Sequence, residues 1–199
     1  MIRTLQFLAF FVPAFFSLHA KGQGWEFDSE RTQLGKFALG VASGVVAHEF
    51  GHFVVATSKG YKVGNDGFSL VYPGAAFTDS DHLQVASAGF QTQWLLSELI
   101  LHDSNRNEQK EPPGDFGAGI VCAHLAITAA YLFYLKDHYQ GDIVGIAEAT
   151  GYSNNQIALA LAIPGVLDAW RLFGNQVPDW VPQLSVASKS LGMAWVWTY

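Results

Sequence analysis

The stretch that decides the fold is residues 45–56, which read VVAHEFGHFVVA. It places His48 and His52 four positions apart, on one face of a helix, with Glu49 beside the first of them. The pattern HExxH on a helix is typical of a zinc site in which two imidazoles bind the metal and the glutamate acts as general base. Ionisable groups in an otherwise apolar helix are costly without such a task. The alternative is a buried helix whose histidines are satisfied by neighbouring side chains.

The composition favours a membrane protein. Half of the 199 residues are hydrophobic and 14% are charged, against about 25% charged residues in ordinary soluble domains. The mean hydropathy is only +0.17, so a soluble enzyme stays open. With a net charge of -6 and scattered basic residues there is no basic patch, and nucleic acid is not expected as a partner. Cys122 is the only cysteine, which excludes an intrachain disulfide and a cysteine-based zinc cluster.

The apolar stretches predict a series of helices around the motif. They cover residues 37–58, 83–101, 116–135 and 157–173, and the first and third are about as long as a membrane span requires. Between the first two, clusters of Gly, Asn, Asp and Pro predict a hairpin within residues 63–77. The expected fold class is therefore an all-α multi-span membrane protein with a short β-hairpin between the first two core helices.

The two ends of the chain carry further signals. Residues 1–20 have the pattern of a signal peptide or an N-terminal anchor, and either would direct the chain to a membrane. Residues 21–199 are expected to form one membrane-embedded domain. In the tail, Trp195 and Trp197 are aromatic residues of the kind that often lie at a membrane interface.

A catalytic zinc site needs a third protein ligand and one open position. Glu98 is the residue that a soluble zincin would offer, from a following helix. Asp168 is the alternative, a carboxylate in an apolar helix. Asp142 and Glu148 are also carboxylates, but their polar surroundings are typical of loops, whereas His124 is interpreted as a histidine of the core. Spacing alone leaves the choice of the third ligand open.

A family resemblance bears on this choice. HEFGH is followed by Ala56, by residues 59–63 (KGYKV) and by residues 68–70 (FSL). This order resembles the opening of the site-2 protease family of intramembrane zinc metallopeptidases. Residues 88–93 (AGFQTQ) are similar to the family's A-G-P-x-x-N segment, and residues 163–171 (IPGVLDAWR) are similar to its I-P-P-L-D-G-G-R segment. The loop after the first block is too short for the PDZ domain that some members carry.

The resemblance implies a zinc ion on His48, His52 and Asp168, with Glu49 as the base that takes a proton from water. Gln91 and Gln93 are candidates for holding the substrate backbone. The implied function is that of a zinc-dependent endopeptidase hydrolysing peptide bonds in or near the membrane, with the lipid bilayer and a membrane-spanning or membrane-proximal protein substrate as partners. The implied location is a multi-pass position in a membrane, with the bacterial inner membrane as the expected one.

Two other hypotheses remain at this point. One is a secreted, soluble HExxH zincin that uses Glu98 as the third ligand. The other is a membrane protein without catalysis, in which zinc serves as a structural staple. Metal content together with activity separates these hypotheses.

Overall fold

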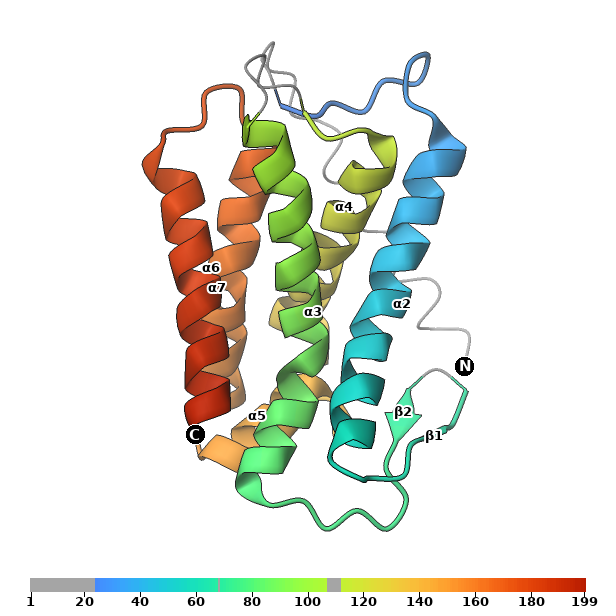
Figure 1. Cartoon of the computed structure of the whole chain (residues 1–199), viewed down its shortest axis with the longest axis vertical. Coiled ribbons are helices and arrows are strands. Elements are labelled where there is room, and N and C mark those ends of the chain that lie inside the picture. Colours follow the sequence, from blue (N-terminus) through green and yellow to red (C-terminus); the bar gives the residue numbers. More distant parts are fainter. Residues whose placement is uncertain (1–23, 68, 107–111) are drawn as a thin grey trace.

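The computed structural model describes residues 24–67, 69–106 and 112–199, so the signal-peptide or anchor prediction for residues 1–20 lies outside the described residues. Long helices standing side by side form a bundle, and a shorter helix, α5, lies across one end of it (Figure 1). In chain order the helices are α2 (Leu34–Ser58), α3 (Asp79–Arg106), α4 (Asp115–Ala130), the π-helix η2 (Tyr131–Leu135) that extends α4, α5 (Asp142–Thr150), α6 (Asn154–Phe173) and α7 (Trp180–Thr198). The all-α class is confirmed.

The predicted hairpin is present but very short. Strand β1 (Gly64–Asn65) pairs antiparallel with β2 (Leu70–Val71), with Gly64 opposite Val71. In the chain the hairpin comes between α2 and α3. In space it lies beside α2, near the end of the bundle where α5 is found (Figure 1). The prediction of a short β-hairpin between the first two core helices is therefore confirmed.

Glycine residues let α2 approach α4 closely. A Cβ atom at Gly40 would collide with the Phe116 carbonyl on α4, and one at Gly44 would lie 2.7 Å from the Ala123 Cβ. Small residues at such contacts let helix backbones come together, as in membrane-embedded helix pairs. Because positions 40 and 44 meet positions 116 and 123 in ascending order, α2 and α4 run parallel.

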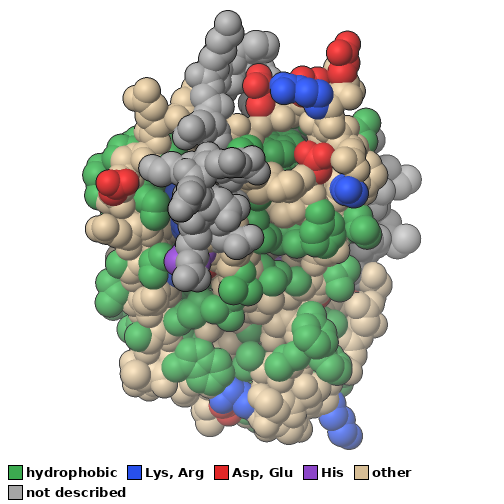
Figure 2. Space-filling model, turned by 45° about the horizontal axis from the view of Figure 1, so that its top comes forward, with side chains coloured by type: hydrophobic (Ala, Val, Ile, Leu, Met, Phe, Trp, Pro, Cys, Tyr) green, Lys and Arg blue, Asp and Glu red, His purple; other side chains and the backbone are tan. Residues whose placement is uncertain are grey.

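The bundle has large apolar side chains on its outer faces, and its interior combines two apolar clusters, around Phe90 and around Leu172, with buried polar side chains. The outer faces of the long helices carry large exposed hydrophobic residues, among them Val46, Phe50, Leu159, Val166 and Leu191. Figure 2 shows hydrophobic side chains spread over the face that it displays, with most visible charged side chains toward its upper and lower edges. Buried polar side chains of the interior include His48, Gln93, His124, Asp168 and Lys189. The apolar outer faces and the buried charged side chains both depart from the distribution usual in a soluble domain.

Within the described residues, three helices are long and apolar enough to cross a membrane: Leu34–Ser58, Asp115–Leu135 and Asn154–Phe173. The third contains Pro164 and still continues to Phe173, supported at its start by a capping box between Ser153 and Gln156. These helices, together with the exposed apolar faces, are consistent with a membrane protein.

Helices α5 and α7 were not predicted from the sequence. Helix α5 has only nine residues, bounded by Gly141 and Gly151, and its short apolar run resembles a loop in composition. Helix α7 carries Pro182 near its start, where the missing N–H of proline is tolerated because the first N–H groups of a helix have no partner within it. Local sequence predicts a loop at α5 and no element at α7, and both segments are helical where they pack against the bundle.

Candidate metal centre

Helix α2 turns the histidines of the motif toward the interior. Its buried residues lie on one side, namely Gly40, Gly44, His48, Gly51, His52 and Ala56. Both histidines are 4% exposed, whereas Val46, Phe50 and Phe53 of the same stretch face outward. The burial follows the helical repeat, because positions four apart share a face.

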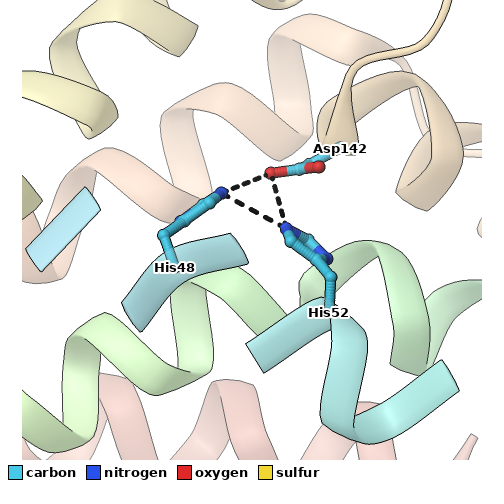
Figure 3. Close-up of side chains that lie close together, drawn as sticks. All are labelled: His48, His52 and Asp142. Atoms are coloured by element: carbon cyan, nitrogen blue, oxygen red, sulfur yellow. Dashed lines mark hydrogen bonds and ion pairs between the residues drawn. The ribbon is translucent and has the colours of Figure 1, made fainter. Parts of the chain in front are cut away.

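Asp142, the first residue of α5, completes a group of three side chains that face one another (Figure 3). Its Oδ2 atom lies 2.9 Å from His48 Nε2 and 3.4 Å from His52 Nε2. The two Nε2 atoms lie 3.3 Å apart. Three donor atoms, one from each residue, therefore form a nearly equilateral triangle.

The size of this triangle fits a tetrahedral metal ion. With bonds of about 2.0–2.1 Å to nitrogen or oxygen, two ligand atoms of a tetrahedron lie about 3.3 Å apart. The separations of 3.3 and 3.4 Å match that edge, and the third, 2.9 Å between His48 Nε2 and Asp142 Oδ2, is a hydrogen-bond distance slightly shorter than it. Two imidazoles and a carboxylate are also a donor set that zinc uses in catalytic sites, where three protein ligands leave one position open. His48, His52 and Asp142 are the residues that would hold the ion.

The hydrogen bonding of His52 supports the same interpretation. Its Nδ1 atom lies 2.7 Å from the carbonyl oxygen of Val85, which can only accept, so Nδ1 carries the proton. In the neutral ring Nε2 then offers a lone pair to the centre of the triangle. Metal-binding histidines usually donate their other N–H to a carbonyl or a carboxylate in this way.

The carboxylate of Asp142 is positioned by the start of α5. The Asp142 backbone N–H donates to the hydroxyl of Tyr131, at 3.3 Å, and Tyr131 begins the π-helix that extends α4. Burial alone would raise the pKa of Asp142, but the imidazoles of His52 and His48 outweigh it and hold the pKa well below its ordinary value. Asp142 is therefore a charged ligand at neutral pH.

Glu49 and Tyr72 border the same centre. The half-buried Glu49 carboxylate interacts electrostatically with His48, His52 and Asp142. Tyr72 follows strand β2, and burial raises the pKa of its phenol, with a further rise from the charges of Asp142 and Glu49. The Tyr72 hydroxyl therefore stays protonated at neutral pH and can donate a hydrogen bond. The hairpin segment thus contributes a polar group near the metal centre.

Gly89 of α3 lies directly against the imidazoles. A Cβ atom there would be 2.5 Å from His48 Nε2 and 2.5 Å from His52 Nε2. Only glycine leaves the two rings in place, because any side chain would push them apart or push α3 away from α2. The close approach of α3 is therefore part of the metal centre.

We expect Gly89→Ala to weaken zinc binding by at least about 10-fold, the lower end of the effect of disturbing groups around metal ligands. The measurement is competition for zinc with a chromophoric chelator. Gly35→Ala is the matched control, since Gly35 is also helical and nothing lies within 4 Å of its Cβ position. Equal affinity of Gly89→Ala and the unmodified protein would contradict the described packing.

Asp168, which the resemblance implied as the third ligand, lies outside the triangle. Its carboxylate is fully buried and bonded to Lys189 Nζ at 2.7 Å, Ser97 Oγ at 2.7 Å and Ser185 Oγ at 2.7 Å. Its oxygens are thus used within a network of α3, α6 and α7. Asp142 has the position that was expected of Asp168.

Glu98, the third ligand expected for a soluble zincin, belongs to the same network. Both its carboxylate oxygens accept from Arg171, at 2.6 and 2.9 Å, and one also accepts from Lys189 at 3.1 Å. We call this network the ionic cluster; it comprises Ser97, Glu98, Asp168, Arg171, Ser185 and Lys189. Two carboxylates and two cations balance its charge, so it needs no metal.

The two glutamines expected near the substrate differ in their surroundings. Gln91 accepts from Trp197 Nε1 at 2.8 Å and donates to Ser87 at 2.8 Å, so it joins α3 to α7. Gln93 is 2% exposed, and neither of its amide atoms has a hydrogen-bond partner among the described residues. Only Gln93 is therefore free to bind something further.

From the sequence, Asp142 is a carboxylate whose polar surroundings indicate a loop residue. The Gly141–Asp142 pair was visible as a turn, and an acidic residue after a turn is also typical of a helix start. That signal predicts a helix and says nothing about which side chain Asp142 meets. The contact with His48 joins residues 94 positions apart.

No protein-family model, curated protein or solved structure matches this chain. The class of protein therefore rests on the fold and the site. The part of the chain that the structure describes is helical, with three helices long and apolar enough to span a membrane and with a His48–His52–Asp142 group that could hold a metal ion.

Proposed function

We propose that this protein is a membrane-embedded zinc endopeptidase of the site-2 protease type. The observation that carries the proposal is the triangle of His48 Nε2, His52 Nε2 and Asp142 Oδ2, with sides of 2.9 to 3.4 Å and with Glu49 beside it. The substrate would be a membrane-spanning or membrane-proximal protein segment. A multi-pass position in a bacterial inner membrane is part of the proposal.

Each group around the centre has a task in this chemistry. When bound, zinc would lower the pKa of a water molecule toward about 7 and polarise the scissile carbonyl. Glu49 is placed to take a proton from the attacking water and to pass it to the leaving amine. Tyr72, which keeps its proton, can donate a hydrogen bond to the oxygen on which negative charge develops.

The polar interior supports hydrolysis within an apolar exterior. Peptide hydrolysis consumes water, and the buried side chains near the centre include the polar Gln93 and His124 beside the apolar Phe90. The outer faces of α2 and α6 are apolar and fit a lipid environment. Helix α3, which carries Gly89 and Gln93, separates the centre from α7.

Removing the metal tests this function. We expect treatment of the detergent-purified full chain with a zinc chelator to reduce cleavage of a fluorogenic membrane-spanning peptide to background, and added Zn²⁺ to restore it. The same chelator already saturated with zinc is the control. Cleavage that persists without the metal would contradict the proposal. Tight zinc binding without cleavage of any membrane-spanning peptide would instead support a structural staple.

A further inference from the structure

Six buried side chains carry polar atoms that have no hydrogen-bond partner among the described residues, namely His48, Gln84, Gln93, Trp94, His124 and Arg171. Three of them lie near the metal centre, and their unpaired atoms are His48 Nδ1, both amide atoms of Gln93 and His124 Nε2. The side chains belong to residues that are only 4%, 2% and 1% exposed. Buried polar groups in proteins nearly always have a partner, either in the protein or in ordered water. Unpaired atoms on three different helices therefore call for one common explanation.

Gln93 lies between the metal centre and the ionic cluster. Gly89, Gln93 and Ser97 follow each other at intervals of four on α3 and share one face. The first lies against the imidazoles, and the third donates to Asp168 at 2.7 Å. The unpaired Gln93 amide is thus one helical turn from Gly89, at the imidazoles, and one turn from Ser97, in the ionic cluster.

His124 lies in the same interval, on α4. Gly44 packs against Ala123 in the parallel pair of α2 and α4, and His48 is one turn after Gly44. His124 therefore lies about one turn from His48, toward the N-terminal end of α2. His124 Nε2 is 3.6 Å from Asp168 Oδ2, too far for a hydrogen bond. Its ring therefore faces the ionic cluster without being bonded to it.

We propose that one or two water molecules are bound between His48, Gln93 and His124 and link the metal centre to the ionic cluster. This inference rests on the metal centre of the proposed function. With Nε2 of His48 turned to the metal, its proton is on Nδ1, which donates to the water. The water donates to Gln93 Oε1 or His124 Nε2, and the Gln93 N–H₂ donates to the water.

This arrangement gives the unpaired atoms of His48, Gln93 and His124 a partner and meets the requirement of two to four polar partners for a buried water. The Nδ1–H of His52 donates to the Val85 carbonyl, which fixes the orientation of that ring. The water would be the corresponding acceptor for the Nδ1–H of His48. Gln93 and His124 are then positioning residues for His48.

The test is Gln93→Leu, measured in two ways on the full chain in detergent. If Gln93 is merely an unpaired amide, leucine removes its desolvation cost, and the thermal midpoint of the metal-free protein rises. If Gln93 holds the water, the midpoint falls, and zinc affinity falls by about 10- to 100-fold. We expect the second result. A raised midpoint, or unchanged zinc affinity, would overturn the proposal.

Gln91→Leu is the matched control, since it lies on the same helix, is 7% exposed and is already paired with Trp197 and Ser87. We expect it to lower the midpoint and to leave zinc affinity unchanged.

Should Gln93→Leu fail to fold, His124 provides a second pair of variants. His124→Leu should weaken zinc binding, and His124→Gln, whose amide can accept from the same water, should largely restore it. Equal affinity in the two His124 variants would contradict the bound water.

The two measurements separate this inference from the proposed function. The midpoint of the metal-free protein does not depend on zinc or on cleavage. If the unmodified chain binds zinc but cleaves no peptide, the proposed endopeptidase fails and the water site is still tested by zinc affinity.

Discussion

Asp142→Ala is expected to reduce zinc affinity by more than about 100-fold, because it removes one of three ligands, and loss of a group that only supports a ligand already costs 10- to 100-fold. Asp142 Oδ2 is the atom that joins the two imidazoles, at 2.9 and 3.4 Å. Without it, only His48 and His52 remain. The measurements are zinc content after gel filtration and competition with a chromophoric chelator.

Two variants control this experiment. Glu148→Ala removes an exposed carboxylate from the same helix and should leave zinc bound. Asp168→Asn should also keep zinc, yet it should destabilise the fold by about 3 to 5 kcal/mol, because it removes one of the two carboxylates that balance the buried Lys189 and Arg171 and leaves Glu98 alone to do so. Loss of zinc in a folded Asp168→Asn protein, with zinc retained in Asp142→Ala, would return the third ligand to Asp168.

Glu49→Gln is expected to lower the rate of peptide cleavage by about 10² to 10⁴ while zinc stays bound. The amide cannot accept the proton of the attacking water, whereas His48, His52 and Asp142 are unchanged. The cleavage rate of a membrane-spanning peptide and the zinc content are measured on the same preparation. Glu148→Gln, which makes the same change at an exposed site, should cleave at the normal rate.

The two readouts distinguish the parts of the proposal. A Glu49→Gln protein that binds zinc and cleaves at the normal rate would remove Glu49 from the mechanism and leave the metal centre intact. Loss of both zinc and cleavage would show that Glu49 supports the ligands rather than the proton transfer. Only loss of cleavage with zinc in place supports the assigned role.

The helical fold was largely predictable. A long apolar stretch that carries HEFGH predicts a helix, and the structure has one at Leu34–Ser58. The apolar run at 116–135 corresponds to α4 and η2, and the turn residues after α2 correspond to the β1–β2 hairpin. These features depend on local periodicity and turn chemistry, which neighbouring residues determine.

The ionic cluster was not predictable in the same way. Asp168 and Glu98 were alternative predictions for the third metal ligand, Asp168 from the family resemblance and Glu98 for a soluble zincin. The cations that they meet are Lys189 and Arg171. Lys189 comes from α7, a helix that the sequence did not indicate.

What the sequence by itself determined is the pair of imidazoles with its glutamate. His48, Glu49 and His52 lie within one helix, and the helical repeat alone brings the two histidines to one face. What only the tertiary structure decided is the third ligand. Asp142, Asp168 and Glu98 offer the same carboxylate chemistry, and the choice among them depends on which one the packing of the helices brings to the histidines. Contacts between residues about a hundred positions apart are set by that packing, and no local pattern records it.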